Sequence, residues 1–106
     1  MSAMIWCPFP DQESATEVAD ALLEDGLIAC ANFLGSVHSR FVWNGEQGVS
    51  DELGVLFKTH SDCLERAVSR IESLHPYETP AILGWHCEVV GAATKEWLGG
   101  LPRSKG

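Results

Sequence analysis

The segment FVWNGEQGV, residues 41–49, joins two extended stretches of the chain, and the turn at its centre decides the fold. Asn44 and Gly45 form the strongest β-hairpin signal in the sequence, because both residues tolerate the positive φ angles that a two-residue turn requires. The extended pattern around this turn covers residues 27–59. Each arm therefore has about 15 residues, against about 5–6 in a typical strand. Gly35 predicts a bulge or bend within the first arm.

Five further elements flank the hairpin, and the spacing of their apolar residues indicates the type of each. A short apolar run is typical of a buried strand, and apolar residues three and four positions apart are typical of an amphipathic helix. Asp11 and Asp62 are suitable N-terminal helix caps, and Glu65 adds a capping arrangement to the second helix. In chain order the sequence predicts a strand over 3–7, a helix from Asp11 to about Gly26, the hairpin, a helix from Asp62 to His75, a strand over 81–90 and a short helix over 94–98.

This order of elements predicts an α+β fold. It corresponds to a ferredoxin-like split βαβ unit, β-α-β-β-α-β plus a short C-terminal helix, in which an antiparallel sheet carries two helices on one face. Helices of about four turns cannot cover such long hairpin arms, and long unpaired strand edges promote aggregation unless they are satisfied. We therefore expect an oligomer whose interfaces use the hairpin. The 106 residues form one domain, 1–106, with a loose tail over about 99–106.

The composition argues against two classes of partner. The formal net charge is −8, with 7 Lys and Arg against 15 Asp and Glu. Nucleic-acid binding depends on cationic groups that release counterions from phosphates, and anionic membranes also attract basic surfaces. We therefore expect no nucleic-acid partner and no membrane partner. An acidic surface either attracts cations or simply keeps the protein soluble.

The cysteines and the N-terminal residues favour the cytoplasm. The 4 cysteines contain no Cys-x-x-Cys pair, so a structural zinc site is not indicated, and free thiols are expected in a reducing compartment. Residues 1–7 lack the basic start and the long apolar core of a signal peptide, and no apolar stretch approaches the ~20 residues of a membrane helix. The sequence therefore predicts a cytoplasmic location.

The segment HPYETP, residues 75–80, is the densest group of candidate functional side chains. An imidazole, a phenol and a carboxylate lie on a loop that prolines stiffen, and such a loop presents polar groups with little loss of entropy. Cys7 ends the first strand, and a thiolate there together with His75 would suit a soft or borderline cation, copper or zinc. The alternatives are structural: a buried unreactive thiol, and side chains that close a helix and pack a turn.

Enzyme signatures are absent, so we expect no catalytic residue and no organic cofactor. The sequence has no nucleophile elbow, phosphate-binding loop or metalloprotease helix. Cys7 and His75 have the residue types of a nucleophile and its base, but nothing places a third, orienting group beside them. An acylphosphatase shares the topology and needs an Arg and an Asn around a phosphate, and Arg40, Asn32 and Asn44 are poorly placed for that role.

Several motifs together resemble the CutA family of divalent-cation tolerance proteins. They span nearly the whole chain in the family's order: Cys7-Pro8 and Asp11, Leu27-Ile28-Ala29-Cys30-Ala31-Asn32, Trp43-Asn44-Gly45-Glu46, Lys58-Thr59 and His75-Pro76-Tyr77-Glu78-Thr79-Pro80. The resemblance implies a ferredoxin-like subunit in a tight homotrimer whose neighbours exchange long hairpins. It also implies a link to copper and other divalent metal ions.

The resemblance further implies candidate metal ligands. Some relatives are described as binding copper through a cysteine and histidines, and Cys7 and His75 match two of these positions. Leu74 stands where those relatives have a second histidine. The segment LGWHC, residues 83–87, also departs from the proline-containing stretch that is usual in the family, so the cap of the trimer is expected to differ.

A second interpretation follows from the similarity of this family to the PII nitrogen-signalling trimers, which hold ligands in clefts between subunits. By that analogy Lys58, Tyr77 and Glu78, together with His75, would line an intersubunit cleft. The alternative function is then a signalling module that binds a small anion or nucleotide. On the strand itself, Lys58 and Glu52 share a face but stand about 20 Å apart, too far to form a pair.

Overall fold

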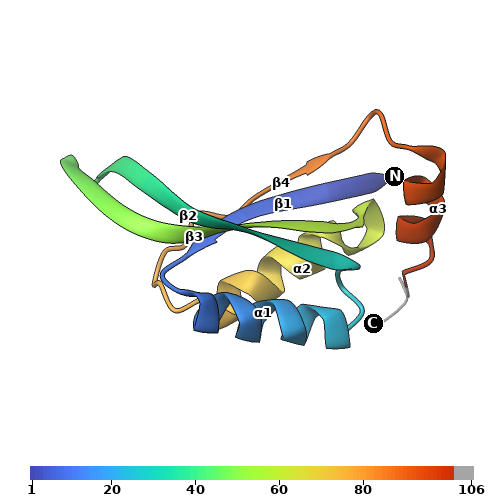
Figure 1. Cartoon of the computed structure of the whole chain (residues 1–106), viewed down its shortest axis with the longest axis horizontal. Helices are drawn as coiled ribbons and strands as arrows, with labels where there is room; N and C mark the ends of the chain where they lie inside the picture. Colours follow the sequence, from blue (N-terminus) through green and yellow to red (C-terminus); the bar gives the residue numbers. More distant parts are fainter. Residues whose placement is uncertain (102–106) are drawn as a thin grey trace.

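The computed structural model describes residues 1–101 and has the α+β architecture that the sequence predicts. Its strands form one antiparallel sheet of four strands (Figure 1). In chain order the elements are β1 (Ser2–Phe9), α1 (Gln12–Glu24), β2 (Cys30–Trp43), β3 (Glu46–His60), α2 (Ser61–Leu74), β4 (Leu83–His86) and α3 (Ala92–Gly99). The strand order is β2-β3-β1-β4, so β1 is a central strand, as predicted.

The core lies between the sheet and the helices α1 and α2, which cover one face of it (Figure 1). Alternate residues of the two central strands point into this layer, as the two-residue period of a strand requires. Phe9 and Phe57 meet there edge to face, with ring centroids 6.3 Å apart. The apolar strand residues with no exposed surface in this layer are Ala3, Ile5, Cys7, Phe9, Val55 and Phe57.

The central hairpin has the length that the sequence predicts, with arms of 14 and 15 residues. Asn44 and Gly45 both have positive φ angles, of 52° and 79°, which confirms the predicted turn. Gly35 has a φ of 95°, and the register of the two arms shifts between Phe33 and Gly35, so the predicted bulge is also confirmed. Beyond the end of β1 the two arms pair only with each other and project from the sheet (Figure 1).

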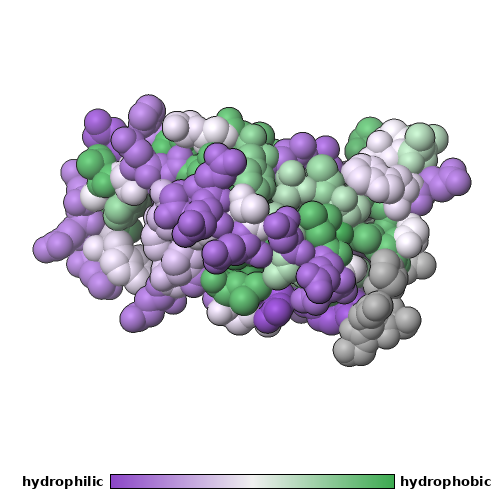
Figure 2. All heavy atoms as spheres, turned by 60° about the horizontal axis from the view of Figure 1, so that its bottom comes forward, coloured by the Kyte–Doolittle hydropathy of each residue, from purple (hydrophilic) through white to green (hydrophobic). Residues whose placement is uncertain are grey.

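The first helix begins and ends as predicted. Asp11 is the N-cap, and its carboxylate accepts a hydrogen bond of 2.8 Å from the N–H of Ser14. The backbone N–H of Ser14, and to a lesser extent its hydroxyl, lower the pKa of the Asp11 carboxyl. Gly26 has a φ of 71° just after the helix, the left-handed conformation that commonly ends a helix. Hydrophilic side chains cover much of the face that carries the two helices (Figure 2).

The predicted start of the second helix is one residue too late, and the predicted N-cap is two residues too late. Asp62 and Glu65 do not cap α2; the N-cap is His60, whose Nδ1 accepts a hydrogen bond of 3.0 Å from the N–H of Asp62. A histidine ring nitrogen with a lone pair satisfies a helix N-terminus in the same way as a carboxylate oxygen. Among residues 1–101, no helix is long and apolar enough to cross a membrane.

The edges of the sheet also differ from the prediction. β4 covers Leu83–His86 and not 81–90, because it pairs only with Ala3–Trp6 of β1. β1 in turn continues through Pro8 to Phe9, and since β4 has already ended there, the missing N–H of proline interrupts no bond to that strand. α3 includes the predicted 94–98, and of the predicted loose tail residues 102–106 lie outside the described part.

Candidate functional site

The structure brings Cys7 and His75 to one backbone carbonyl at the end of β1. The Sγ of Cys7 lies 3.6 Å from the oxygen of Pro8, and the Nε2 of His75 donates to the same oxygen at 2.8 Å. His75 directly follows α2, and Pro76 holds it in an extended conformation there. The loop after α2 is therefore hydrogen-bonded to the end of the central strand, and Cys7 and His75 lie at the same rim of the sheet.

The imidazole of His75 uses both of its ring nitrogens inside the protein. While Nε2 donates to Pro8, Nδ1 accepts a hydrogen bond of 3.1 Å from the N–H of Tyr77, so the neutral ring carries its proton on Nε2. The ring also stacks on Phe9 at a centroid distance of 4.5 Å. Burial lowers the pKa of His75, although the Pro8 carbonyl and the charge of Glu52 oppose this shift. His75 is therefore neutral, and both of its ring nitrogens are hydrogen-bonded within the protein.

Tyr77 reaches from the loop to the hairpin. Its hydroxyl donates to Oε2 of Glu52 at 2.9 Å, and its ring lies 4.8 Å from that of His75. Burial raises the pKa of Tyr77 to about 12, and the hydrogen bond and charge of Glu52 add to the shift. Ser50 also bonds to this hydroxyl, and Asp11 contributes negative charge nearby. Sequence reasoning gave Glu52 no role, and its only signal was its position on the same strand face as Lys58.

Cys7 has no exposed surface. Burial raises the pKa of its thiol to about 12, and the negative charge of Glu52 adds to the effect. The thiol is therefore protonated at neutral pH, whereas the thiolate is the form that attacks electrophiles and binds metals. The lone pair of the neighbouring imidazole is already taken by a backbone N–H, so the pair lacks the free base of a nucleophilic site.

The side chains present do not form a ready metal site within one chain. No group of 3 or more His, Cys, Asp and Glu side chains in residues 1–101 is arranged to hold a metal ion. Cys7 would have to lose its proton, and His75 would have to give up one of its two hydrogen bonds, before either side chain bound a cation. Leu74, at the position of the missing second histidine, is 37% exposed.

Within one chain, the candidate cleft residues lie in two separate places. Tyr77 lies beside Glu52, and Glu78 is exposed on the same loop. Lys58 pairs with Met4 at the opposite end of β3, about 20 Å along the strand from Glu52. The chain therefore brings Tyr77 near the Cys7 and His75 pair but does not bring Lys58 to it.

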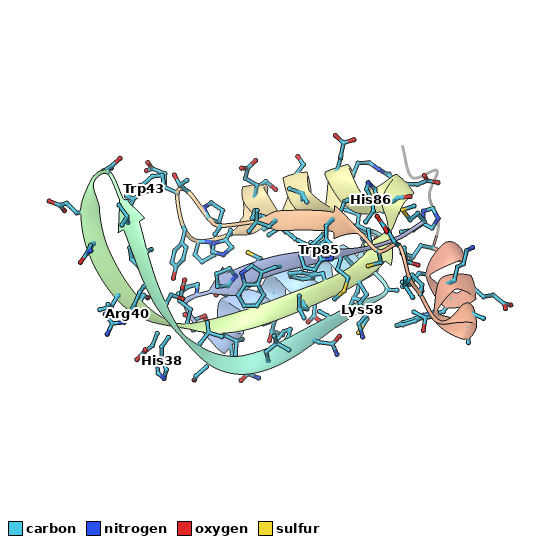
Figure 3. The ribbon with its side chains drawn as sticks, turned by 90° about the horizontal axis from the view of Figure 1, so that it is seen from above. His38, Arg40, Trp43, Lys58, Trp85 and His86 are labelled. Carbon is cyan, nitrogen blue, oxygen red and sulfur yellow. The ribbon has the colours of Figure 1, made fainter. Side chains whose placement is uncertain are left out.

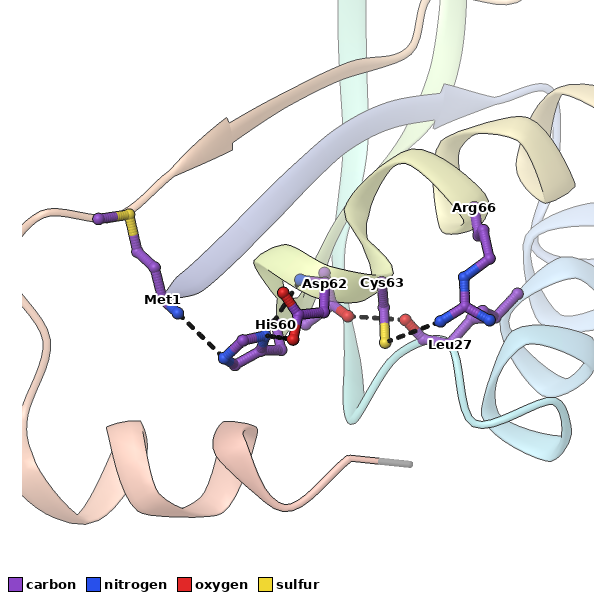
Figure 4. A network of polar contacts seen from close by, with 7 residues as sticks. Met1, Leu27, His60, Asp62, Cys63 and Arg66 are labelled. Atoms are coloured by element: carbon purple, nitrogen blue, oxygen red, sulfur yellow. Dashed lines mark hydrogen bonds and ion pairs between the residues drawn. The ribbon is translucent and has the colours of Figure 1, made fainter. Parts of the chain in front are cut away.

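The remaining histidines, His38, His60 and His86, lie on other parts of the fold. His60 caps α2, and its Nε2 lies 3.0 Å from the terminal amino group of Met1 (Figure 4). One turn further along this helix, Arg66 contacts Cys63 with Nη2 and Sγ 3.9 Å apart. His38 lies on the hairpin and His86 on β4 (Figure 3).

The fold and the motifs agree with a single protein family. The family model described as CutA1 divalent ion tolerance protein matches residues 3–100. This chain belongs to the CutA1 family. The divalent-cation tolerance protein CutA of Pyrococcus horikoshii is 38% identical over 95 residues, which cover 90% of this chain and 92% of that protein. CutA1 proteins are named for tolerance of divalent ions and not for a reaction, which supports a role in divalent-cation tolerance.

Solved CutA structures have the same fold. The CutA1 of Ehrlichia chaffeensis superposes with a TM-score of 0.86 at 31% identity and covers 92% of both chains. A protein of Archaeoglobus fulgidus, named periplasmic divalent cation tolerance protein CutA, gives a TM-score of 0.87 at 28% identity over 93% of this chain and 96% of its own. The similarity therefore extends over the sheet, the hairpin and the helices together.

Proposed function

We propose that this chain is the ferredoxin-like subunit of a cytoplasmic homotrimer that acts in divalent-cation tolerance by binding copper or another divalent cation. The observation that carries this proposal is the meeting of Cys7 and His75 at one carbonyl, beside the negative charge of Glu52, in a member of the CutA1 family. The proposal includes no catalysed reaction and no organic cofactor.

The surface of the hairpin and of the sheet supports the homotrimer. Large apolar side chains that monomers normally bury are exposed here, and such surfaces are typical of subunit interfaces. β2 is also an edge strand of 14 residues whose outer side has no partner strand within the described chain. On the sheet face opposite α1, Trp85 points away from the helices (Figure 3). The exposed apolar side chains include Phe41, Val42, Trp43, Val49, Leu83 and Trp85.

Cation binding at Cys7 and His75 is expected to require the loss of a proton and of a hydrogen bond. The thiol must release a proton, and the imidazole must exchange a hydrogen bond to Pro8 or Tyr77 for the cation. Metal affinity falls when ligands must first be deprotonated or freed. We therefore expect a site that binds more weakly than a preformed one and that moves the loop over residues 75–80 when it is filled.

The test is calorimetric titration of Cu²⁺ into the assembled protein. The variants Cys7→Ser and His75→Ala should lose the binding, while Cys63→Ser and His38→Ala, which alter the same residue types elsewhere, should keep it. Unchanged binding in the first pair would refute the site. Sedimentation of the wild-type protein as a stable species of 11.5 kDa would refute the trimer. Binding of a nucleotide, but of no cation, would favour the PII-like signalling alternative.

The cytoplasmic location is a separate part of the proposal. All four cysteines are free thiols in the structure, which is the state expected in a reducing compartment. Cell fractionation with an antibody to the native chain tests it, and recovery in a periplasmic fraction, as the name of the Archaeoglobus relative suggests for that protein, would refute it.

A further inference from the structure

The helical face of the subunit carries a groove between the end of α1 and the outer side of α2. Its volume is about 500 Å³, which is within the usual range for small-molecule sites. α1 begins beside the rim that holds Cys7 and is about 20 Å long, so the groove at its far end is separate from the candidate metal ligands (Figure 1). The residues that line the groove include Glu24, Asp25, Arg66, Ser69 and Arg70.

Arg66 and Arg70 form one wall of this groove. They stand four positions apart on α2, so they lie one turn apart on the same face of the helix. Arg66 is half-buried and lies beside Leu27 and Cys63 (Figure 4). Two like charges at this spacing destabilise a helix slightly, and two of the chain's 7 Lys and Arg residues are nevertheless placed here. This wall therefore favours an anionic partner.

Glu24 and Asp25 form the opposing wall, at the C-terminal end of α1. The partial charge at a helix C-terminus is negative, so acidic residues are unfavourable there, and the last turn of α1 contains no basic residue. One hydrogen bond joins the two walls, because Nε of Arg70 donates to Oδ2 of Asp25 at 3.2 Å. A guanidinium has five N–H donors, so this bond uses only part of the capacity of Arg70.

The two walls thus present opposite charges across an open space. A simple anion would be attracted by the arginines and repelled by the carboxylates, and a simple cation would meet the reverse. A zwitterion matches both walls. We propose that the groove binds a free α-amino acid, with its carboxylate at the guanidinium groups of Arg66 and Arg70 and its ammonium group beside the carboxylate of Glu24. Guanidinium and carboxylate form paired, charge-assisted hydrogen bonds, which suit this orientation.

The groove stays accessible in the proposed homotrimer. The apolar side chains that the trimer is expected to bury lie on the hairpin and on the sheet face opposite α1 and α2. Hydrophilic side chains cover much of the face that carries the helices (Figure 2). Each subunit therefore has its own groove, and the inference goes beyond the proposed function: it holds whether or not Cys7 and His75 bind a cation.

The experiment follows the backbone amide signals of the ¹⁵N-labelled full chain by NMR during titration with L-alanine, acetate and methylammonium. L-Alanine carries both charges on a minimal side chain, and the other two probes carry one charge each. We expect L-alanine to shift the amides of Leu27 and Ser69 along saturable curves, with an affinity about tenfold or more above that of either half-ligand. No saturable shift, or an equal affinity for L-alanine and a half-ligand, would overturn the proposal.

Substitution of one arginine tests the carboxylate side of the site. Arg70→Gln removes a charged donor and should weaken the binding of L-alanine by about tenfold or more. The matched control, Arg40→Gln, removes an arginine of the hairpin and should leave the affinity within about twofold of wild type. Wild-type affinity in Arg70→Gln would refute the assignment.

Substitution of Glu24 separates a ligand contact from a structural role. Glu24→Gln removes the partner of the ammonium group, so it should weaken the binding of L-alanine and leave the binding of acetate unchanged or stronger. A change that only disturbed the end of α1 would weaken both probes to the same degree, and that result would overturn the orientation proposed for the zwitterion.

Discussion

Strand β3 passes through two different environments. Near its end Val55 and Phe57 have no exposed surface, whereas Val49 near its start is 69% exposed. β2 shows the same contrast, because Ala31 packs against the core while Trp43 is 56% exposed. Both halves of the hairpin carry apolar side chains, but only one half is covered by α1 and α2.

The difference shows which part of the sequence serves which purpose. The covered half is completed by its own chain, so its apolar residues stabilise the subunit. The projecting half, residues 36–52, has no covering layer within the described chain, so its apolar residues are available for association. Stability of the fold and stability of the assembly should therefore respond to different substitutions along one strand.

The largest expected effect comes from truncating the covered half. Phe57→Ala should lower the free energy of unfolding by about 3–5 kcal/mol, because it leaves a cavity beside Phe9. Val49→Ala on the same strand should change it by less than about 0.5 kcal/mol when the subunit is measured alone. Urea unfolding followed by circular dichroism at several protein concentrations separates the two. Similar losses of unfolding free energy for both variants would contradict the division of β3 into a covered half and a projecting half.

A smaller effect is expected from adding a methyl group to a glycine in each half. A Cβ at Gly54 meets the half-buried Trp6 at 2.6 Å, and Gly54→Ala should cost about 1–3 kcal/mol through overpacking. A Cβ at Gly48 meets the ring of Phe41 at 2.5 Å, but that ring is 46% exposed and is free to turn away. Thermal unfolding of the two variants compares their stabilities. A greater loss of stability for Gly48→Ala would show that the projecting arm is the more rigid half.

The hairpin was predictable from the sequence because its determinants are local. Asn44-Gly45 specifies its turn by the φ angles these residues tolerate, and Gly35 specifies the bulge in the same way. Asp11 likewise caps α1 through a residue three positions away. Such signals require no knowledge of distant parts of the chain, which explains why turn, bulge and first helix agree with the structure.

The features that sequence reasoning missed depend on contacts between distant residues. β4 is short because β1 offers it only four positions, Ala3–Trp6, a limit that is not encoded in residues 81–90 themselves. The contact of Tyr77 with Glu52 joins residues 25 positions apart. Cys7 and His75 could be placed together from the sequence only because the strand order puts both residues at one rim of the sheet. The carbonyl of Pro8 that both side chains contact could not be predicted, because a backbone group leaves no mark in the amino-acid sequence.

The covered half should also respond to alkaline pH. Cys7 has a folded-state pKa raised from 9.0 to about 12, so the unfolded state loses this proton first and stability decreases as the pH rises above 9. The decrease is at most about 1.4 kcal/mol per pH unit for one proton. Between pH 9 and 10, Cys7→Ala should flatten the profile, while above 10 the raised pKa of Tyr77 keeps a residual slope. An unchanged slope in Cys7→Ala, measured by urea unfolding, would exclude this origin.

The smallest effect is expected from the best-formed polar contact of the projecting arm. His38 and Asp51 face each other across the strands, with Nδ1 and Oδ1 2.6 Å apart, but both side chains are about four-fifths exposed. Solvent screens such a pair, so a double-mutant cycle with His38→Ala and Asp51→Asn should give a coupling energy below about 1 kcal/mol that decreases further with salt. A larger, salt-independent coupling would show that a neighbouring subunit buries this pair, which would place the interface on the outer side of the arm and not only on its apolar side.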